Sequence, residues 1–301
     1  MGLIELLATG PAPIDGGMAS ELEARGHDLS GRLWSARMLI DDPGEVQKVH
    51  EAYIASGARV TISASYQCSQ HALALAGHDP AEADVLLTRS VEVARAACQA
   101  AGQPDVLVAA SVGPYGAALA DGSEYRGNYG LSHDELVDFH APRLAVLAAA
   151  APDLFAVETI PDALEASAIA TALAEYPRIP AWVTFACRNS ATTCGGDAFT
   201  DAVRAAGAAP SVVAVGVNCT APEHVAGLLR LAADATDVAL VAYPNAGRAW
   251  DATARAWSGA ASDELAPDDV RSWVEAGAKL VGGCCGVGPA AISGISRVLN
   301  G

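Results

Sequence analysis

The stretch Val212-Val-Ala-Val-Gly-Val-Asn-Cys219 is a continuous apolar run that ends in an amide and a thiol. Unbroken apolarity over this length is typical of a parallel β-strand that is covered on both faces. Pro222 follows closely, and proline is favoured in the first turn of a helix. The segment therefore predicts a strand, a short turn and a helix, which together make one β/α unit.

The same pattern recurs along the whole chain. Short apolar runs lie at residues 13–15, 58–64, 106–112, 154–159, 181–187, 212–218, 237–244 and 278–285. Eight such units in about 300 residues predict an α/β fold of the (β/α)8 TIM-barrel type. A doubly wound open sheet is the alternative, but no Gly-x-Gly-x-x-Gly motif follows the first run.

Helical patterns fill the intervals between these runs. Residues 43–56 begin with proline and stop at Gly57, and residues 80–101 stop at Gly102. Ser132 and Glu135 have the spacing of a capping box at the start of the next helix. Four prolines are placed near later helix starts, at Pro161, Pro222, Pro267 and Pro289.

Composition excludes several classes of protein. The 301 residues are 51% hydrophobic, which is enough for a core and argues against global disorder. The net charge of −17 argues against a nucleic-acid partner, because such proteins need clustered Lys and Arg. We expect no membrane partner, since no apolar run reaches the ~18 residues of a bilayer span. Seven cysteines and no basic leader at the N-terminus predict a reducing, cytoplasmic location.

Cysteines stand at the ends of two predicted strands. Cys219 ends the sixth run, and Cys284 and Cys285 end the eighth. A barrel brings both strand ends to one rim, and three thiolates suit zinc with its fourth position open. Neighbours on a regular strand point to opposite faces, so the flanking glycines would have to bend the chain. Inert core thiols and a vicinal disulfide remain alternatives. Cys187 and Cys194 also lie near a predicted strand end, so either could contradict the assignment of these three ligands.

Two carboxylates also occupy predicted strand ends. Asp15 precedes two glycines after the first run, and Glu158 ends the fourth. A carboxylate at such a place is costly unless it is paired, so a cationic ligand or hydrogen-bond donors are implied. A Gly- and Tyr-rich stretch, 113–129, could cover a ligand. Only Lys48 and Lys279 exist, and neither is predicted at the barrel mouth, which disfavours a Schiff-base aldolase.

Taken together, these motifs resemble the zinc-dependent homocysteine S-methyltransferases, in particular the branch that uses S-methylmethionine or S-adenosylmethionine. The matching stretches are residues 15–23, 33–36, 64–67, 111–116, 121–127, 158–159, 216–219, 243–245 and 282–285. The segments 187–199 and 286–288 depart from the family pattern, and they leave the choice of donor open.

The resemblance implies a single homocysteine-binding barrel domain over residues 1–301. It implies methyl transfer to L-homocysteine, giving methionine, with Zn²⁺ as the cofactor. Cys219, Cys284 and Cys285 would be the zinc ligands, and Asp15 and Glu158 would hold the amino-acid part of homocysteine. Further substrate contacts are expected from polar residues at the strand ends, namely Tyr66, Gln67, Ser111, Tyr115 and Asn218. No catalytic residue beyond the zinc site is expected.

Other functions stay open at this point. A related methyltransferase could use another thiol or a selenol as acceptor, or a betaine-type donor. A redox protein could use the neighbouring thiols of Cys284 and Cys285. A barrel that binds metal without turnover is a further alternative.

Overall fold

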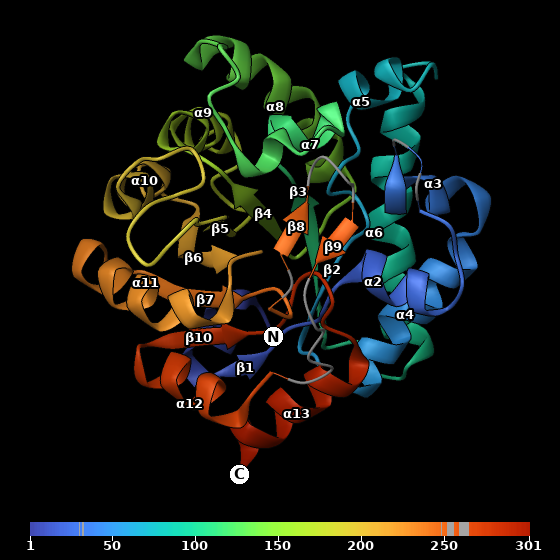
Figure 1. Cartoon of the computed structure of the whole chain (residues 1–301). Helices are drawn as coiled ribbons and strands as arrows, with labels where there is room; N and C mark the ends of the chain where they lie inside the picture. Colours follow the sequence, from blue (N-terminus) through green and yellow to red (C-terminus); the bar gives the residue numbers. More distant parts are fainter. Residues whose placement is uncertain (30, 32, 248, 252–255, 259–264) are drawn as a thin grey trace.

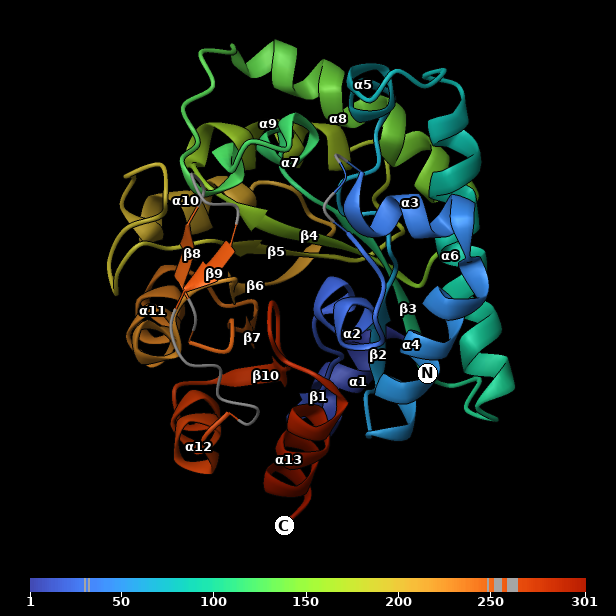
Figure 2. The same ribbon diagram turned by 45° about the vertical axis from the view of Figure 1, so that its right-hand side comes forward.

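Eight parallel strands form one ring in the computed structural model, as the sequence pattern predicts (Figures 1 and 2). The structure describes residues 1–29, 31, 33–247, 249–251, 256–258 and 265–301. Neighbouring strands pair in the order β1-β10-β7-β6-β5-β4-β3-β2. The two outer strands of this order meet through a parallel bridge between Ile14 and Val60, and the Arg59 N–H donates to the Pro13 carbonyl at 2.8 Å. The (β/α)8 barrel is confirmed, and the open doubly wound sheet is wrong.

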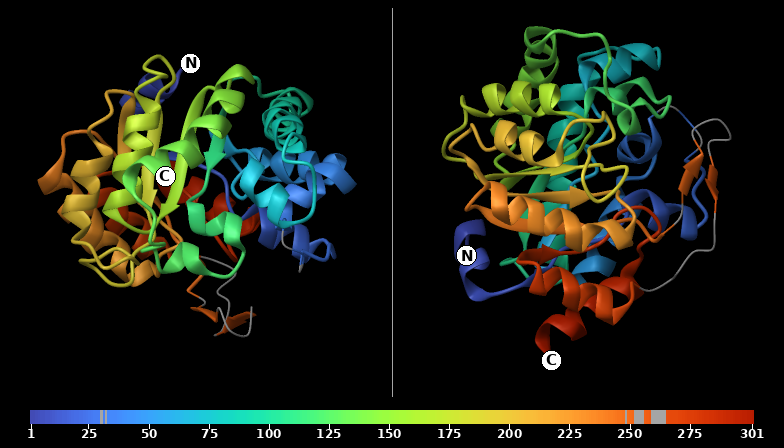
Figure 3. Two further views of the ribbon diagram at one scale, coloured as in Figure 1. Left: turned by 90° about the horizontal axis from the view of Figure 1, so that it is seen from above. Right: turned by 60° about the vertical axis from the view of Figure 1, so that its left-hand side comes forward.

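The barrel strands are β1 (Ala12–Pro13), β2 (Val60–Ile62), β3 (Leu107–Val112), β4 (Leu154–Ile160), β5 (Ala181–Phe185), β6 (Val212–Asn218), β7 (Ala239–Tyr243) and β10 (Ala278–Val281). An antiparallel pair, β8 (Ala249–Asp251) and β9 (Ala256–Ser258), is inserted between β7 and β10. Figure 3 shows this pair standing out from the body of the molecule.

The helices are α1 (Leu3–Thr9), α2 (Met18–Ala24), α3 (Trp34–Asp41), α4 (Pro43–Ala55), α5 (Gln70–Leu75), α6 (Glu82–Ala100), α7 (Tyr115–Leu119), α8 (His133–Ala149), α9 (Ala163–Leu173), α10 (Phe199–Ala206), α11 (Pro222–Ala235), α12 (Pro267–Glu275) and α13 (Pro289–Asn300), with one 3₁₀ turn, η1 (Ser123–Tyr125). Pro222, Pro267 and Pro289 each open a helix, because proline loses no helical hydrogen bond there. The Ser132–Glu135 capping box is also present. None of the described helices is long and apolar enough to cross a membrane.

Two apolar clusters fill the fold. One lies between the strands and the surrounding helices, and the other fills the inside of the ring. The inner cluster includes Leu107, Leu154 and Leu280 from the strands, and α1 adds Leu3 and Leu6, each 1% exposed. We call this amino end of the barrel the floor, and the carboxyl end of the strands the mouth. The apolar contacts of α1 close the floor.

The strand ends differ from the prediction at two places that bear on the site. β10 ends at Val281, whereas the apolar run extends to Cys285, so both cysteines lie in the following loop. β1 ends at Pro13, so Asp15 also lies beyond its strand. The glycines at 282 and 283 explain the early end, since the backbone there turns inward to pack against Ile14 and Val287.

Candidate functional site

Three cysteine sulfurs meet at the mouth of the barrel. Cys219 follows β6 directly and has a left-handed backbone, with φ of 45°. Its N–H donates to the Tyr243 carbonyl at 3.3 Å, and the Cys284 N–H donates to the Pro244 carbonyl at 2.7 Å. Both loops are thus anchored on the end of β7, which lies between β6 and β10 in the sheet. This shared anchor brings Cys219 beside the Cys284–Cys285 loop.

The spacing of the sulfurs fits a thiolate metal site. The Cys285 Sγ lies 3.9 Å from the Cys219 Sγ and 3.9 Å from the Cys284 Sγ. Two thiolates on a tetrahedral zinc ion, each about 2.3 Å from the metal, would be about 3.8 Å apart. Within the described ranges, this trio is the one group of His, Cys, Asp and Glu whose ligand atoms all lie within 4.8 Å of each other. The donor set therefore fits zinc.

Cys219 and Cys284 are joined by a disulfide in the structure, with their Cα atoms 5.6 Å apart. A metal needs the deprotonated thiolates, so this bond must be reduced before all three sulfurs can bind an ion. The neighbouring Cys284 and Cys285 are not bonded to each other, so the vicinal disulfide considered from sequence is absent at this pair. Cys187 and Cys194, which were alternative candidates from the sequence, are free cysteines and do not belong to this group of three.

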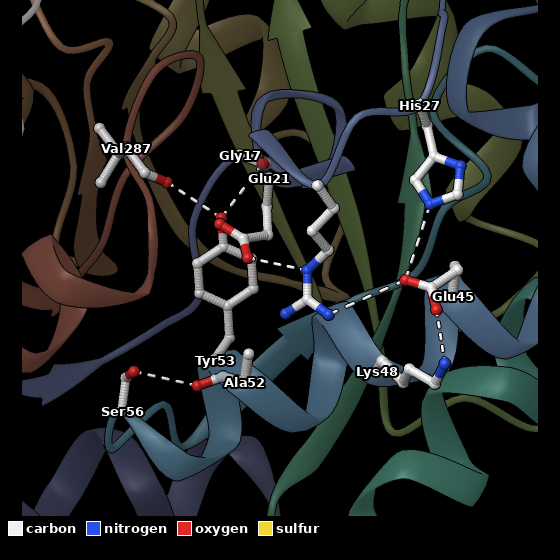
Figure 4. A network of polar contacts seen from close by, with 10 residues as sticks. Gly17, Glu21, His27, Glu45, Lys48, Ala52, Tyr53, Ser56 and Val287 are labelled. Carbon is white, nitrogen blue, oxygen red and sulfur yellow. Dashed lines mark hydrogen bonds and ion pairs between the residues drawn. The ribbon is translucent and has the colours of Figure 1, made fainter. Parts of the chain in front are cut away.

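Close backbone packing holds the two loops that carry Asp15 and Cys284. At Gly17, a Cβ atom would lie 2.5 Å from the Cys284 carbonyl oxygen, so only glycine fits there. The Tyr53 hydroxyl from α4 lies 3.1 Å from the Gly17 carbonyl and 3.0 Å from the Val287 carbonyl (Figure 4). It can donate to either oxygen, and so it links the loop after β1 to the loop after β10.

The two candidate carboxylates, Asp15 and Glu158, are both buried at the mouth. Asp15 is 2% exposed, and its Oδ2 accepts from the Ile62 N–H at 2.7 Å and the Thr61 hydroxyl at 3.1 Å. Its Oδ1 is buried without a hydrogen-bond partner. Burial raises the pKa of Asp15 well above its usual range, and the nearby Glu158 charge raises it further. This carboxylate is therefore costly to ionise until a cation approaches.

Glu158 accepts a hydrogen bond from a hydroxyl group on the neighbouring strand β3. The Ser111 hydroxyl on β3 donates to its Oε1, and the Tyr243 hydroxyl on β7 is close enough to lower the pKa of the Glu158 carboxyl. Burial nevertheless raises the pKa of Glu158 to about 7. The structure thus brings Asp15, Ser111 and Glu158 into one charged corner.

Asn218, which is expected to contact the substrate, forms its hydrogen bonds with residues at the ends of neighbouring strands. Its Oδ1 accepts from the Thr159 N–H at 2.7 Å and from the Thr184 hydroxyl at 2.9 Å. Its Nδ2 donates to the Thr159 hydroxyl at 2.7 Å. Asn218 is completely buried, and these bonds connect the ends of β4, β5 and β6. The amide orders the strand ends next to Cys219.

The residues after β2 and β3 that are expected to contact the substrate lie in different surroundings. Tyr66 hydrogen-bonds to Thr159, and the charge of Glu158 acts on its hydroxyl, which places Tyr66 beside the charged corner. Gln67 donates to the Ala117 carbonyl at 2.9 Å and keeps its Oε1 buried without a partner. Tyr115, by contrast, packs its ring among His71, Tyr129 and Phe139. These aromatic contacts tie Tyr115 to the outer helices.

From the sequence, Glu124 and Tyr125 on the turn η1 are only part of the Gly- and Tyr-rich stretch that could cover a ligand. Tyr125 hydrogen-bonds to Cys285, while burial and the charge of Glu124 raise the pKa of that thiol to about 12. Burial also raises the pKa of Glu124 to about 7. The sequence does show an acidic residue inside the Gly- and Tyr-rich stretch. The position of its side chain depends on the turn η1, which cannot be predicted from the spacing of residues in the sequence.

Comparison with known proteins gives consistent matches over the full chain. The family model described as homocysteine S-methyltransferase matches residues 14–299. The homocysteine S-methyltransferase of Escherichia coli is 43% identical, covering 94% of this chain and 93% of that protein. The homocysteine S-methyltransferase YbgG of Bacillus subtilis is 40% identical, covering 94% and 92%.

Solved structures agree with these sequence matches. The metallated form of the homocysteine methyltransferase MmuM from Escherichia coli superposes with a TM-score of 0.87 at 40% identity, covering 98% of this chain and 99% of that chain. Its oxidized form gives 0.85 at 41% identity, with 95% of each chain covered.

Proposed function

The chain belongs to the homocysteine S-methyltransferase family, and from this premise we propose how it methylates homocysteine. The methyl donor is a sulfonium, S-methylmethionine or S-adenosylmethionine, and the product is methionine. Residues 1–301 act as one homocysteine-binding domain. The observation that carries the proposal is the convergence of three sulfurs from two distant loops beside two buried carboxylates.

Cys219, Cys284 and Cys285 would hold a zinc ion. Three protein ligands leave the fourth tetrahedral position for a substrate, which is the pattern of catalytic rather than structural zinc. A bound zinc ion would supply a Lewis-acid position that favours loss of the proton from the homocysteine thiol. Because the ligands must be reduced thiolates, we place the enzyme in the reducing cytoplasm.

Asp15 and Glu158 bind the ammonium group of homocysteine. The Oδ1 of Asp15 has no partner, and an ammonium would satisfy it and offset the cost of burying the charge. Ser111 fixes the orientation of Glu158, since its hydroxyl donates to the Oε1 of that carboxylate. The amino acid is then held with its side chain free to extend toward the cysteines.

Methyl transfer breaks the methyl–sulfur bond of the donor and forms one to the homocysteine sulfur. The bonding electron pair stays on the donor, which leaves as a neutral thioether, so no general acid is needed. A free thiol with a pKa near 8.5 is only about 3% ionised at pH 7, and full ionisation is worth about 2 kcal/mol. Enzymes lower barriers by about 8 kcal/mol or more, so most of the rate must come from positioning the reacting atoms in line.

The proposal is tested on reduced, zinc-loaded protein. Methionine formation from homocysteine is compared with S-methylmethionine, S-adenosylmethionine and betaine as donors, alongside the zinc content. We expect turnover with at least one sulfonium, lost after treatment with a chelator and restored by zinc. Full turnover by metal-free protein, or turnover with betaine alone, would contradict it.

A further inference from the structure

Glu124 is a buried carboxylate that the reaction described above does not use. It is 1% exposed, and its Oε2 has no hydrogen-bond partner. Burial of a carboxylate with a free oxygen is costly, and a native protein keeps such a group where a ligand or partner satisfies it.

The turn η1 fixes the position of this carboxylate. Gly122 has φ of 80°, and the Ser123 N–H donates to the Asp121 Oδ1 at 2.9 Å. The backbone of α7 packs directly against the turn, since a Cβ atom on Gly116 would lie 2.6 Å from the Ser123 carbonyl carbon. The carboxylate therefore sits on a rigid support.

Glu124 lies on a turn that packs against β4, the strand that carries Glu158. It lies close enough to Cys285 for its charge to act on that thiol, and it acts in the same way on the Tyr66 and Tyr125 hydroxyls. Both tyrosines are only partly buried. A carboxylate with two tyrosine rings around it is an arrangement that attracts a cation.

Among the described residues Glu124 forms no salt bridge, although the charge of Arg126 lowers the pKa of its carboxyl. Arg126 lies two residues away, but it is 57% exposed and its ion pair, at 3.7 Å, is with Asp121. The other charges acting near Cys285 are carboxylates, including Glu23 of α2. The side-chain charges that act on Cys285 are therefore negative.

We propose that Glu124 recognises the positive sulfonium sulfur of the methyl donor and so determines donor specificity. This rests on the proposed function. The homocysteine ammonium already has Asp15 and Glu158, whereas Glu124 precedes Tyr125, which contacts Cys285, and the sulfonium must approach the thiol on that side. Recognition is of the charge at sulfur, which S-methylmethionine and S-adenosylmethionine share.

The reaction itself predicts which kinetic constant depends on Glu124. The positive charge of the donor disappears as the methyl group moves, so a carboxylate beside it stabilises the bound donor more than the transition state. Loss of this carboxylate should raise the KM for the donor by about thirty-fold or more and leave kcat unchanged or higher. The KM for homocysteine should change by less than about two-fold.

The experiment compares Glu124→Gln with wild type in two assays. The first measures both KM values and kcat with S-methylmethionine. The second measures binding of S-methylmethionine and of homoleucine without homocysteine; homoleucine is the neutral amino acid in which a CH group replaces the sulfonium. Wild type should prefer the sulfonium, and the variant should bind the two with affinities within about three-fold of each other.

A matched control and a second variant complete the test. Glu23→Gln removes an exposed carboxylate that also acts on Cys285, and it should leave the donor preference intact. Glu124→Asp keeps the charge but shortens its reach, and it should give an intermediate preference; it also serves if Glu124→Gln does not fold. An unchanged ratio of the two affinities in Glu124→Gln or Glu124→Asp would overturn the inference. Failure of the proposed function would show separately, as no methionine formed by the wild type.

Discussion

The two ends of the barrel bury side chains for opposite purposes. At the floor, Leu3 and Leu6 of α1 pack on apolar strand residues, so burial removes apolar surface from water. At the mouth, buried oxygens of Asp15, Gln67 and Glu124 have no partner. One end contributes stability, and the other buries polar groups at a cost in stability that, on our proposal, a bound ligand offsets. Substitutions at the two ends should therefore have separable effects.

The largest effect is expected at the mouth, from Cys284→Ser. It removes one of three sulfurs, and the loss should exceed the 10–100-fold effect of residues that only surround metal ligands. We expect zinc content and methionine formation to fall together, measured by metal analysis and turnover. Cys68→Ala is the control, since Cys68 is a buried free thiol outside the trio. Normal activity in a zinc-free Cys284→Ser protein would contradict the assignment.

Leu6→Ala tests the floor. Removing a buried leucine side chain leaves a cavity and should lower the free energy of unfolding by about 2–5 kcal/mol, measured by urea denaturation. The KM values and kcat of the folded fraction should stay within about two-fold of wild type. Ile4→Ala, at a position 66% exposed on the same helix, should cost far less. A large change in KM for homocysteine with Leu6→Ala would show that the two ends are coupled.

Asp15→Asn tests whether a carboxylate at the mouth serves a ligand. Loss of the charge facing an ammonium should raise the KM for homocysteine by about thirty-fold, with zinc content unchanged. Asp153→Asn is the counterpart at the floor, where Asp153 accepts from the Val108 N–H at 2.7 Å and pairs with Arg95. That variant should alter stability alone. Loss of zinc from Asp15→Asn would show that Asp15 supports the metal site instead.

Glu165 offers a further comparison, because it is a buried carboxylate that hydrogen-bonds to other groups of the protein. Its Oε1 accepts from the Tyr115 N–H at 2.6 Å and lies 2.9 Å from the His140 Nε2. Burial raises its pKa from 4.5 to about 8. Between pH 4.5 and about 8 the folded protein binds the Glu165 proton more tightly than the unfolded chain does. The contribution of Glu165 to the free energy of unfolding is therefore fully present below the unfolded pKa, and it is lost as the pH rises through this range.

We expect Glu165→Gln to flatten this dependence. Unfolding in urea at several pH values from about 5 to 8 should show a wild-type decline of at most about 1.4 kcal/mol per pH unit from this group, and a smaller decline in the variant. Glu175→Gln, at an exposed position, is the control. Equal slopes in wild type and Glu165→Gln would contradict the assignment of the raised pKa.

The fold was predictable because its pattern is local. Strands that are covered on both faces must be apolar throughout, and prolines such as Pro222 and Pro289 mark helix starts because no hydrogen bond is lost there. The inserted pair β8–β9 and the helix α1 were not foreseen, because short strands and an N-terminal apolar segment carry no distinctive period.

The site was predictable in its residue types and only partly in its geometry. The run of apolar residues suggested that Cys284 and Cys285 end a strand, but the chain leaves the sheet at Val281, where glycines allow close contact with the loop after β1. The partners of Asp15 and Glu158 come from other strands, and the free oxygen of Glu124 depends on a turn. Such contacts between distant parts of the chain cannot be predicted from the spacing of residues in the sequence.

The pairing of β1 with β10, together with the Tyr53 hydroxyl near both the Gly17 and Val287 carbonyls, has a consequence for protein synthesis. Cys219 leaves the ribosome well before Cys284 and Cys285, and the first strand must wait for the last one before the ring can close. The three cysteines can therefore come together only after the last barrel strand has been made, so the metal ion that we propose would be bound late, once the ring has closed.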